Sequence, residues 1–446
     1  MQKPDNLCMA PWTHTYLSPQ TERRLCCASR EPAQNFKQYI DTAEGTGEYK
    51  PSTLDEYWNG ENIRRIRMQM LNNEVPPECE VCDKRLLNHD VYRDYFNHLF
   101  AHKWEDVVVN TEWDGYTTMK PISWDYRFSN LCNFKCRMCG PMLSSAWETE
   151  ARKQNKIEPW MEKPVKRAIE TFQKDVVEQE FAQAVEEHRI EEVYWVGGEP
   201  LMYEQHWRYM QRIIELGDGP NLYARYNTNL SRIEYKGVNL YDDILNNVRD
   251  WQICASIDGT GAVGEYIRTG LNYKEWLQYF AMGTKIARRD RRKMRIDFTL
   301  TLPGLFEIVN ICRLARDFNV DILAKVVFAF TPDIAVFIVK VVESPDILYS
   351  VLEPEMVRVV FAPGEIVKVV AIYRVISLSS VTVPLIRRET AASPEVKTSK
   401  SYTYCPAVAL DEVAAGKFIF TLPLVGVGIV HVKLNATEES SSDDLA

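Results

Sequence analysis

The feature that most constrains this chain is the segment Cys132–Cys139, which reads Cys-Asn-Phe-Lys-Cys-Arg-Met-Cys. Its cysteines have three and then two residues between them, a spacing that lets them ligate three irons of one iron–sulfur cluster and leave the fourth iron open to a small chelator. Thiolates also bind zinc or copper(I), and free cysteines can simply be buried. Structural zinc sites close with a fourth Cys or His at a short spacing, and none follows before His188. The sequence therefore favours a cluster.

The triplet Cys132, Cys136 and Cys139 resembles the signature of the radical S-adenosylmethionine (SAM) enzymes. In that family the open iron is chelated by the amino and carboxylate groups of SAM. The resemblance implies that these three cysteines hold a [4Fe–4S] cluster and that SAM is bound to it.

A second set of cysteines precedes this segment. The pair Cys79 and Cys82 offers two thiolates from one turn, and Cys8 and Cys26 flank a hairpin-like segment that can bring two more beside it. Spacing alone does not separate a zinc site from a fully ligated [4Fe–4S] cluster. Of the adjacent cysteines we predict Cys26 as the ligand and Cys27 as the spare, because neighbours on a strand point to opposite sides.

The surrounding residues resemble the SPASM/twitch module, which holds auxiliary iron–sulfur clusters in many radical SAM enzymes. The matching motifs are Cys8–Trp12, Leu25–Cys27, Leu54–Glu61, Arg64–Met70 and Pro77–Cys82. The resemblance implies a second, auxiliary [4Fe–4S] cluster on Cys8, Cys26, Cys79 and Cys82. In most members the module follows the catalytic core, whereas here it precedes it.

From Lys120 onward, strand-like and helix-like segments alternate. We predict strands at 121–128, 192–196, 222–228, 251–257, 295–301 and 324–330, and helices at 142–156, 165–187, 203–216, 273–289 and 305–318. Such alternation predicts a parallel sheet with functional residues at the carboxyl ends of its strands. The fold class is therefore α/β, and its strands match the partial (β/α)6 TIM-like barrel of the radical SAM family.

The segment Gly197-Gly198-Glu199 ends one of these strands. Two glycines let the backbone approach a ligand closely, and the carboxylate can accept hydrogen bonds from an ammonium group. A tight strand-to-helix turn is the alternative interpretation. The segment resembles the radical SAM motif that holds the methionine amino group of SAM.

Polar residues end the next two strands. Asn229 follows one, and Ser256 and Asp258 follow the other, where such groups can hydrogen-bond ribose hydroxyls. Helix N-capping explains Asn229 and Asp258 equally well. The run from Ser256 to Gly270 resembles a stretch of SPASM-type enzymes that lies near SAM, which implies cofactor-binding roles for Ser256, Asp258 and Arg268.

The composition limits the other classes of function. With 446 residues, 46% of them hydrophobic, the chain can bury one large core and a smaller one. Its formal charge of −9, without a long Lys/Arg block, predicts no nucleic-acid partner. It begins without a secretory signal and has no apolar run long enough to span a bilayer, so we expect a cytoplasmic protein without membrane contact. Eleven cysteines in such a chain favour metal or redox chemistry over disulfides.

We predict four regions: an auxiliary-cluster α+β module at 1–110, the radical SAM barrel at 118–332, a β-rich region at 333–436 and a disordered acidic tail at 437–446.

The resemblance implies an enzyme that reductively cleaves SAM to a 5′-deoxyadenosyl radical, which abstracts hydrogen from a substrate. A peptide or protein is the expected substrate, since SPASM-type relatives often modify peptides, and an external one-electron donor is required. The competing hypothesis is a non-catalytic iron–sulfur or zinc protein with an electron-transfer or structural role.

Overall fold

The structure is a computed structural model that describes residues 3–30, 51–85 and 92–326 and five short strands at 338–339, 356–360, 371–372, 419–423 and 428–432. The chain divides into two compact units. The first comprises Met1–Ser256 and Arg268–Met294, and the second comprises Ile257–Ile267 and Arg295–Ala446.

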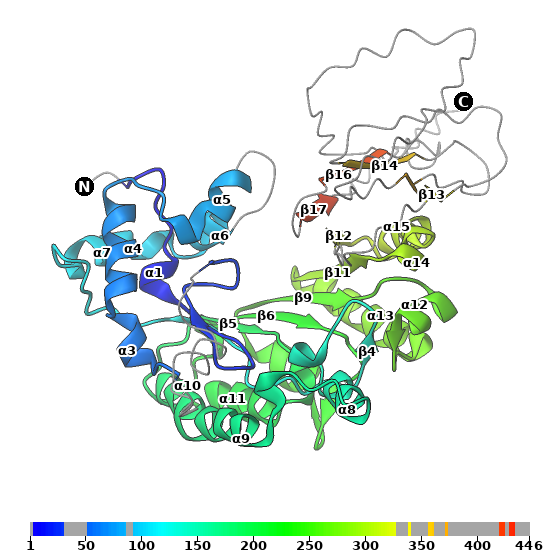
Figure 1. Ribbon diagram of the computed structural model, residues 1–446, viewed down its shortest axis with the longest axis horizontal. Coiled ribbons are helices and arrows are strands. Elements are labelled where there is room, and N and C mark those ends of the chain that lie inside the picture. The colour runs from blue at the N-terminus through cyan, green and yellow to red at the C-terminus, as the bar shows by residue number, and fades with distance from the viewer. Residues whose placement is uncertain are drawn as a thin grey trace, which may run out of the picture. The chain divides into compact units, whose positions relative to one another are not determined.

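The first unit is built on six neighbouring strands in the order β9-β6-β5-β3-β1-β2 (Figure 1). They are β1 (His14–Leu17), β2 (Arg23–Arg24), β3 (Ser123–Tyr126), β5 (Glu192–Trp195), β6 (Tyr223–Thr228) and β9 (Asp250–Ser256). All neighbours pair in parallel except β2, which forms an antiparallel hairpin with β1. Because β1 pairs with β3, the amino-terminal segment extends the same sheet, which the sequence did not indicate.

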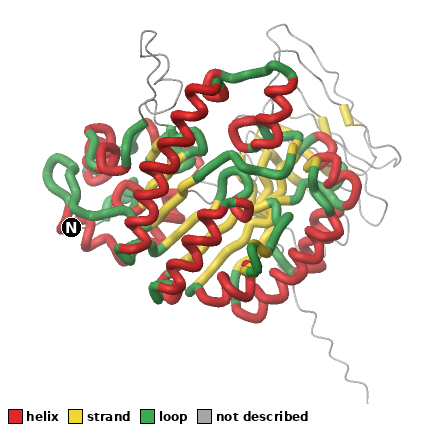
Figure 2. Tube along the Cα trace, turned by 90° about the horizontal axis from the view of Figure 1, so that it is seen from below, coloured by secondary structure: helices red, strands yellow, loops and turns green. Residues whose placement is uncertain are grey.

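One face of this sheet is apolar and covered by helices. Trp124 and Tyr126 of β3 and Trp195 of β5 contact Phe181 with ring centroids 5.6, 6.3 and 5.9 Å away. Phe181 belongs to α10 (Glu178–Glu186), which lies with α9 (Lys163–Phe172) and α11 (Glu204–Glu215) on that face (Figures 1 and 2). Large aromatic groups in offset or edge contact bury much of the area that stabilises such a layer.

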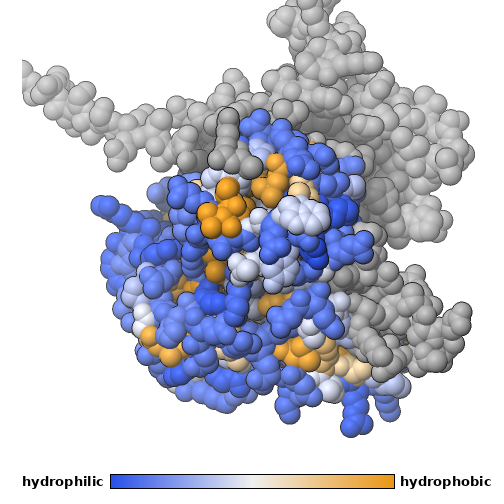
Figure 3. Space-filling view, turned by 90° about the vertical axis from the view of Figure 1, so that its left-hand side faces the viewer, coloured by the Kyte–Doolittle hydropathy of each residue, from blue (hydrophilic) through white to orange (hydrophobic). Residues whose placement is uncertain are grey.

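The amino-terminal helices pack around a core of their own. They are α1 (Ala10–Thr13), α3 (Leu54–Trp58), α4 (Glu61–Leu71), α5 (Glu80–Arg85), α6 (Tyr92–Leu99) and α7 (Trp104–Asn110). α3 begins at a capping box in which Thr53 and Glu56 exchange hydrogen bonds. α4 buries Ile63, Ile66 and Met70, the apolar side chains that recur at helical spacing in the sequence. The outer surface of these helices is mostly hydrophilic, with small separate apolar spots (Figure 3).

Further elements of the first unit follow or include the central cysteine segment. α8 (Ser145–Lys153) follows that segment in the chain, and α13 (Tyr273–Asp290) is the longest helix described in the first unit. The two-residue strands β4 (Lys135–Cys136) and β10 (Arg268–Thr269) pair antiparallel, so that Arg268 lies opposite Cys136.

The second unit continues the alternation of strands and helices. It contains α12 (Gly261–Ile267), β11 (Lys293–Leu300), α14 (Leu302–Leu305), α15 (Ile308–Phe318) and β12 (Asp321–Val326). β11 and β12 are parallel, and β17 (Gly428–Val432) pairs antiparallel with β12. The other short strands form antiparallel pairs: β13 (Ile338–Val339) with β15 (Ala371–Ile372), and β14 (Met356–Val360) with β16 (Ile419–Pro423).

The predicted fold class is confirmed: six predicted strands are present as β3, β5, β6, β9, β11 and β12, and helices follow them. Two helices differ from the prediction. The helix predicted at 165–187 contains a π-helical turn at Gln173–Val177, and the one predicted at 305–318 is interrupted between α14 and α15. Residues 327–330 of the last predicted strand, the tail 437–446 and most of 333–436 lie outside the described residues. Among the described residues, no helix has both the length and the apolarity needed to cross a membrane.

Candidate functional site

The three cysteines of the central motif lie on one loop that is fastened on both sides. The backbone N–H of Cys132 donates to Ser145 Oγ at 3.1 Å, and the indole N–H of Trp147 donates to the carbonyl oxygen of Cys136 at 2.8 Å. The N–H of Cys139 donates to the same carbonyl at 3.0 Å. The pairing of β4 with β10 holds the opposite side of the loop. The loop therefore presents its thiols from a fixed backbone.

Two polar side chains direct N–H groups at sulfur atoms of this loop. Asn229 Nδ2 lies 3.9 Å from Cys132 Sγ, and Arg268 Nη1 lies 3.9 Å from Cys136 Sγ. Asn229 Nδ2 also donates to Asn133 Oδ1 at 3.0 Å. Hydrogen bonds to the sulfurs are among the features that tune iron–sulfur clusters. Asn229 and Arg268, both predicted from the sequence, are thus brought to the cysteine loop.

The Gly-Gly-Glu turn packs directly against the residues that precede Cys132. A Cβ on Gly198 would lie 2.3 Å from the carbonyl oxygen of Leu131, and Gly197 has a φ of +127°. The N–H of Glu199 donates to the same Leu131 carbonyl at 2.7 Å. Both glycines are therefore required by the backbone itself, one for close approach and one for its conformation.

The carboxylate of Glu199 joins this turn to the end of β6. Its Oε1 accepts hydrogen bonds from Thr228 Oγ1 at 2.6 Å and from the N–H of Leu201 at 3.0 Å, and its Oε2 accepts from the N–H of Asn229 at 2.6 Å. The side chain is buried, and burial raises the pKa of Glu199 to about 7 in spite of these donors. Glu199 thus fixes the relative positions of the glycine turn and Asn229.

The remaining predicted residues have different surroundings. Ser256 is the last residue of β9 and is buried. Asp258 belongs to the second unit, where its Oδ1 accepts from the N–H of Thr299 at 2.7 Å. Asn229 Oδ1 accepts from the N–H of Ser231 at 2.9 Å in a loop, so the helix-capping interpretation is wrong for Asn229.

The donors on the cysteine loop suit an iron–sulfur cluster. Burial raises the pKa of the Cys132 thiol to about 12 and also raises the pKa of Cys139. Such thiols are neutral by themselves and lose their protons when a metal supplies positive charge. Three thiols and two side-chain N–H groups aimed at sulfur match what a cluster needs. Within the part of the chain that the structure describes, no three Cys, His, Asp or Glu side chains are grouped as ligands of a single metal ion.

The amino-terminal cysteines meet in one cavity. Cys8, Cys26, Cys79 and Cys82 line it, although they come from three separate places in the chain. Burial raises the pKa of the Cys8 thiol to about 12 and also raises the pKa values of Cys26 and Cys79. The four cysteines predicted as a set are therefore brought together.

The adjacent Cys27 does not line this cavity. Its thiol hydrogen-bonds Tyr92 and lies within electrostatic range of Asp125 and Arg127. Cys26 and Cys27 lie in a bend and turn after β2, so the strand alternation expected for them is absent. The thiols of Cys26 and Cys27 nevertheless have different surroundings, and only Cys26 lines the cavity with the other three cysteines.

A polar network covers the other face of the sheet in the first unit, and the sequence analysis missed it. Arg225 Nε donates to Glu192 Oε1 at 2.6 Å, and its guanidinium lies 4.2 Å and 4.1 Å from the ring centroids of Tyr95 and Tyr194. The signal was present in β3 and β5, which read Ser-Trp-Asp-Tyr and Glu-Val-Tyr-Trp. Polar and apolar residues alternate in both, as expected where one face meets helices and the other a polar interior.

Arg127 extends this network to the glycine turn. Its Nε and Nη2 donate to Asp125 at 3.1 and 3.2 Å, and its guanidinium lies 4.8 Å from the ring centroid of Tyr16. A Cβ on Gly197 would lie 3.1 Å from Arg127 Cβ. A positive side chain therefore lies beside the turn, on the polar face of the sheet.

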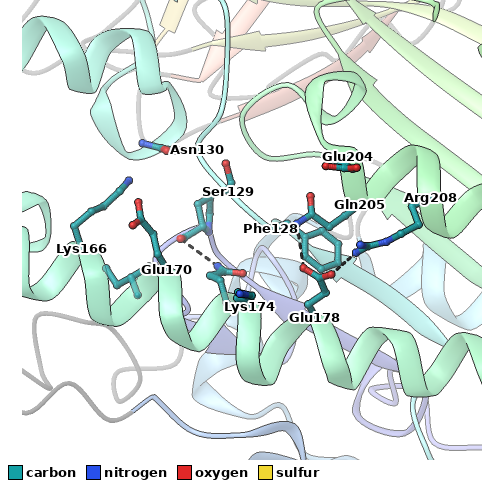
Figure 4. A pocket seen from close by; sticks show the side chains of 13 residues that line it. Phe128, Ser129, Asn130, Lys166, Glu170, Lys174, Glu178, Glu204, Gln205 and Arg208 are labelled. Atoms are coloured by element: carbon teal, nitrogen blue, oxygen red, sulfur yellow. Dashed lines mark hydrogen bonds and ion pairs between the residues drawn. The ribbon is translucent and has the colours of Figure 1, made fainter. Parts of the chain in front are cut away.

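A separate pocket of about 500 Å³ lies between residues 128–130, which lead into the cysteine loop, and the helices α9, α10 and α11 (Figure 4). Its charged residues have both signs, with Glu178 on α10 accepting from Gln205 Nε2 at 3.2 Å and pairing with Arg208 of α11. At the other end Asn130 Nδ2 and Lys166 Nζ donate to Glu148 at 2.8 and 2.9 Å. Through Glu148, these contacts link Asn130, just before the cysteine loop, to α8 and α9.

Comparison with known families accounts for both cysteine sets. The model of the radical SAM superfamily matches residues 126–304, which contain the cysteine loop, the glycine turn, β6 and β9. Residues 126–304 belong to the radical SAM superfamily. The model of the SPASM iron–sulfur cluster-binding domain matches residues 8–83, which contain the four cysteines of the amino-terminal cavity. The predicted order, SPASM module before radical SAM domain, is confirmed, and the cofactors of these domains are a [4Fe–4S] cluster with SAM and an auxiliary cluster.

Several solved structures are similar to this radical SAM chain. Streptococcus suis SuiB has 14% sequence identity and a TM-score of 0.33, with 64% of this chain and 58% of SuiB covered. Native anSMEcpe with bound AdoMet and Cp18Cys peptide has 14% identity and a TM-score of 0.29, with 43% of this chain and 46% of that one covered. The chain thus spans about half the length of these structures. No curated protein sequence matches it.

Proposed function

We propose that this chain is an enzyme that cleaves SAM reductively and uses the resulting radical to abstract hydrogen from a peptide or protein. The single observation that carries the proposal is the convergence at Cys132–Cys139. Asn229 and Arg268 direct N–H groups at its sulfurs, and the Gly197–Glu199 turn packs against the residues that immediately precede it. A loop with three thiols and no fourth cysteine suits a cluster with one open iron.

Each group has a proposed task. Cys132, Cys136 and Cys139 would hold the catalytic cluster. The backbone of Gly197 and Gly198 would approach the methionine part of SAM, and Glu199 would hold that turn against β6 while its carboxylate accepts from an ammonium group. Asn229, Ser256 and Arg268 would lie beside the cofactor. Asp258 belongs to the second unit, and its role rests on the family resemblance alone.

When bound, the cluster and SAM supply one-electron cleavage of SAM to methionine and a 5′-deoxyadenosyl radical. The chain positions these groups: β4 and β10 hold the cysteine loop, and Glu199 ties the turn to Asn229. The polar face that carries Arg127, Asp125 and Tyr194 would receive the substrate and exclude bulk water from the reaction.

The peptide part of the proposal is supported by the SPASM match at 8–83, because relatives with this module often modify peptides. An external one-electron donor would reduce the catalytic cluster. We also propose the boundaries predicted from the sequence, 1–110 for the auxiliary-cluster module and 118–332 for the radical SAM domain.

The test is anaerobic reconstitution with iron and sulfide followed by SAM and dithionite. We expect 5′-deoxyadenosine from the unaltered chain and none from Cys136→Ala. The matched control is Cys312→Ala, since Cys312 is buried on α15 in the second unit and belongs to neither cysteine set; it should retain activity.

Two measurements separate the alternatives. A catalytic cluster whose EPR spectrum is unchanged by SAM would support a non-catalytic protein and overturn the proposal. Iron content distinguishes the amino-terminal site: about eight irons per chain indicates two clusters, and about four with one zinc indicates a structural zinc site.

A further inference from the structure

The cavity formed by the amino-terminal cysteines also contains a buried cation. Arg93, the second residue of α6, lines the cavity together with Cys8, Cys26, Cys79 and Cys82. Only 2% of its surface is exposed, so its guanidinium is removed from bulk water. Burying a cation costs free energy, and negative charge nearby offsets that cost. The cavity places this cation in the same small space as the four cysteines.

The electrostatics of the cavity agree with this position. Arg93 lies within electrostatic range of Cys8 and Cys79, two of the cysteines that line the cavity with it. A positive charge at this distance favours negative charge on a group bound there.

Two other charged groups act on the cavity. Glu78 also lines it, but its Oε1 is paired with Arg65 outside. Lys3 acts on Cys8 as well, and burial lowers the pKa of Lys3. Of the cations acting on these cysteines, Arg93 is the one whose side chain lines the cavity in the described structure.

A charge in this position matters most for a redox centre. Each electron added to an iron–sulfur cluster makes the cluster more negative, and a cation nearby favours the more negative state. Net charge, hydrogen bonds to sulfur and solvent exposure set the reduction potentials of such clusters. A structural zinc site, which does not change its charge, would gain no comparable benefit.

We propose that Arg93 raises the reduction potential of the auxiliary cluster and so makes the amino-terminal site competent to accept an electron. This inference rests on the proposed function only in requiring that Cys8, Cys26, Cys79 and Cys82 hold an iron–sulfur cluster. It assigns Arg93 a tuning role, exerted through the cluster and without contact to the substrate.

The test is a potentiometric titration of the full-length chain carrying Cys136→Ala, in which the auxiliary cluster supplies the EPR signal. In that background Arg93→Gln should lower the equilibrium constant for one-electron reduction by tenfold or more, which corresponds to about 59 mV. Arg93→Lys keeps the charge and should retain most of the potential. The matched control is Arg288→Gln, because Arg288 is exposed on α13 and its loss changes the net charge equally.

Each result decides between tuning and structure. An unchanged potential in Arg93→Gln, or an equal shift in Arg93→Lys, overturns the inference and leaves SAM cleavage untouched. If Arg93→Gln loses its iron, the result for Arg93→Lys decides. An Arg93→Lys chain that keeps its iron and the parent reduction potential supports the charge effect. Loss of iron from both variants overturns the inference. Zinc in the parent site overturns both the inference and the auxiliary cluster, while 5′-deoxyadenosine formation by the unaltered chain would still support the catalytic site.

Discussion

The contact between Gly198 and Leu131 makes a sharp test of how the glycine turn supports the cysteine loop. In Gly198→Ala the new Cβ would lie 2.3 Å from the Leu131 carbonyl oxygen, and it would also lie 2.8 Å from the carbonyl carbons of Asn130 and Leu131. These are backbone atoms, which cannot turn aside as a flexible side chain can. Cβ atoms essentially never lie closer than 3.0 Å to such an atom, so the two segments must separate by at least about 0.7 Å.

That separation would lengthen a short hydrogen bond between the two segments. The Glu199 N–H and the Leu131 carbonyl are 2.7 Å apart, and a separation of about 0.7 Å takes them beyond the range of good N–H···O bonds. The lost bond and the overpacking together should cost about 2–4 kcal/mol of unfolding free energy. Leu131 immediately precedes Cys132, so the movement reaches the cluster loop, and a misplacement near 1 Å can cost about 10²-fold in rate.

The assay is 5′-deoxyadenosine formation with iron content and urea unfolding measured on the same samples. Gly140→Ala is the matched control: Gly140 follows Cys139, has an extended backbone with φ −138° and ψ −177°, and has open space where a Cβ would be. We expect wild-type behaviour from Gly140→Ala and about a hundredfold loss from Gly198→Ala. Parent activity and stability in Gly198→Ala would refute the reasoning.

Two further predictions concern stability. His206 is buried, and burial lowers its pKa to about 3, so below about pH 6.5 the unfolded chain binds a proton at this residue and the folded chain does not. Between pH 7.5 and 5.0 this residue should lower the free energy of unfolding by about 2 kcal/mol, and urea unfolding of His206→Phe should show a decrease that is smaller by that amount. Arg225→Met leaves the buried carboxylate of Glu192 without its cation and should lower the free energy of unfolding by about 3–5 kcal/mol in the same assay. The double variant Arg225→Met with Glu192→Leu should recover more than half of that loss. A loss below about 1 kcal/mol for the single variant would contradict the ion-pair account.

Much of the fold could be predicted because its strands and helices follow simple periodic patterns. β5 and β6 end where a Gly-Gly pair and an Asn interrupt the pattern, and the structure places their ends close to the predicted positions. The π-helical turn at Gln173–Val177 was not predictable, because an inserted residue leaves the composition of an amphipathic helix unchanged. The parallel pairing of β1 with β3 depends on contacts more than a hundred residues apart, which local pattern does not record.

The candidate site was predictable where chemistry restricts residue type. Cysteine spacing and glycine pairs leave few alternatives, so the cysteine sets and the Gly197–Glu199 turn were found from the sequence. Arg93 and Arg225 were not, since a buried arginine has the same sequence signature as an exposed one. Their significance comes from neighbours on other elements, Cys8 and Cys79 for the first and Glu192 for the second.

The pairing of β1 with β3 has a consequence for how this chain could be divided. A fragment beginning after the amino-terminal helices would expose the backbone edge of β3, with Trp124 and Tyr126 on it, as a template for pairing with other chains. The SPASM-matched segment therefore supplies the edge strands β1 and β2 of the sheet as well as four cysteines. Removing that segment would take a strand from the sheet together with the four cysteines, so the cluster module and the sheet cannot be separated at this border without leaving an open edge.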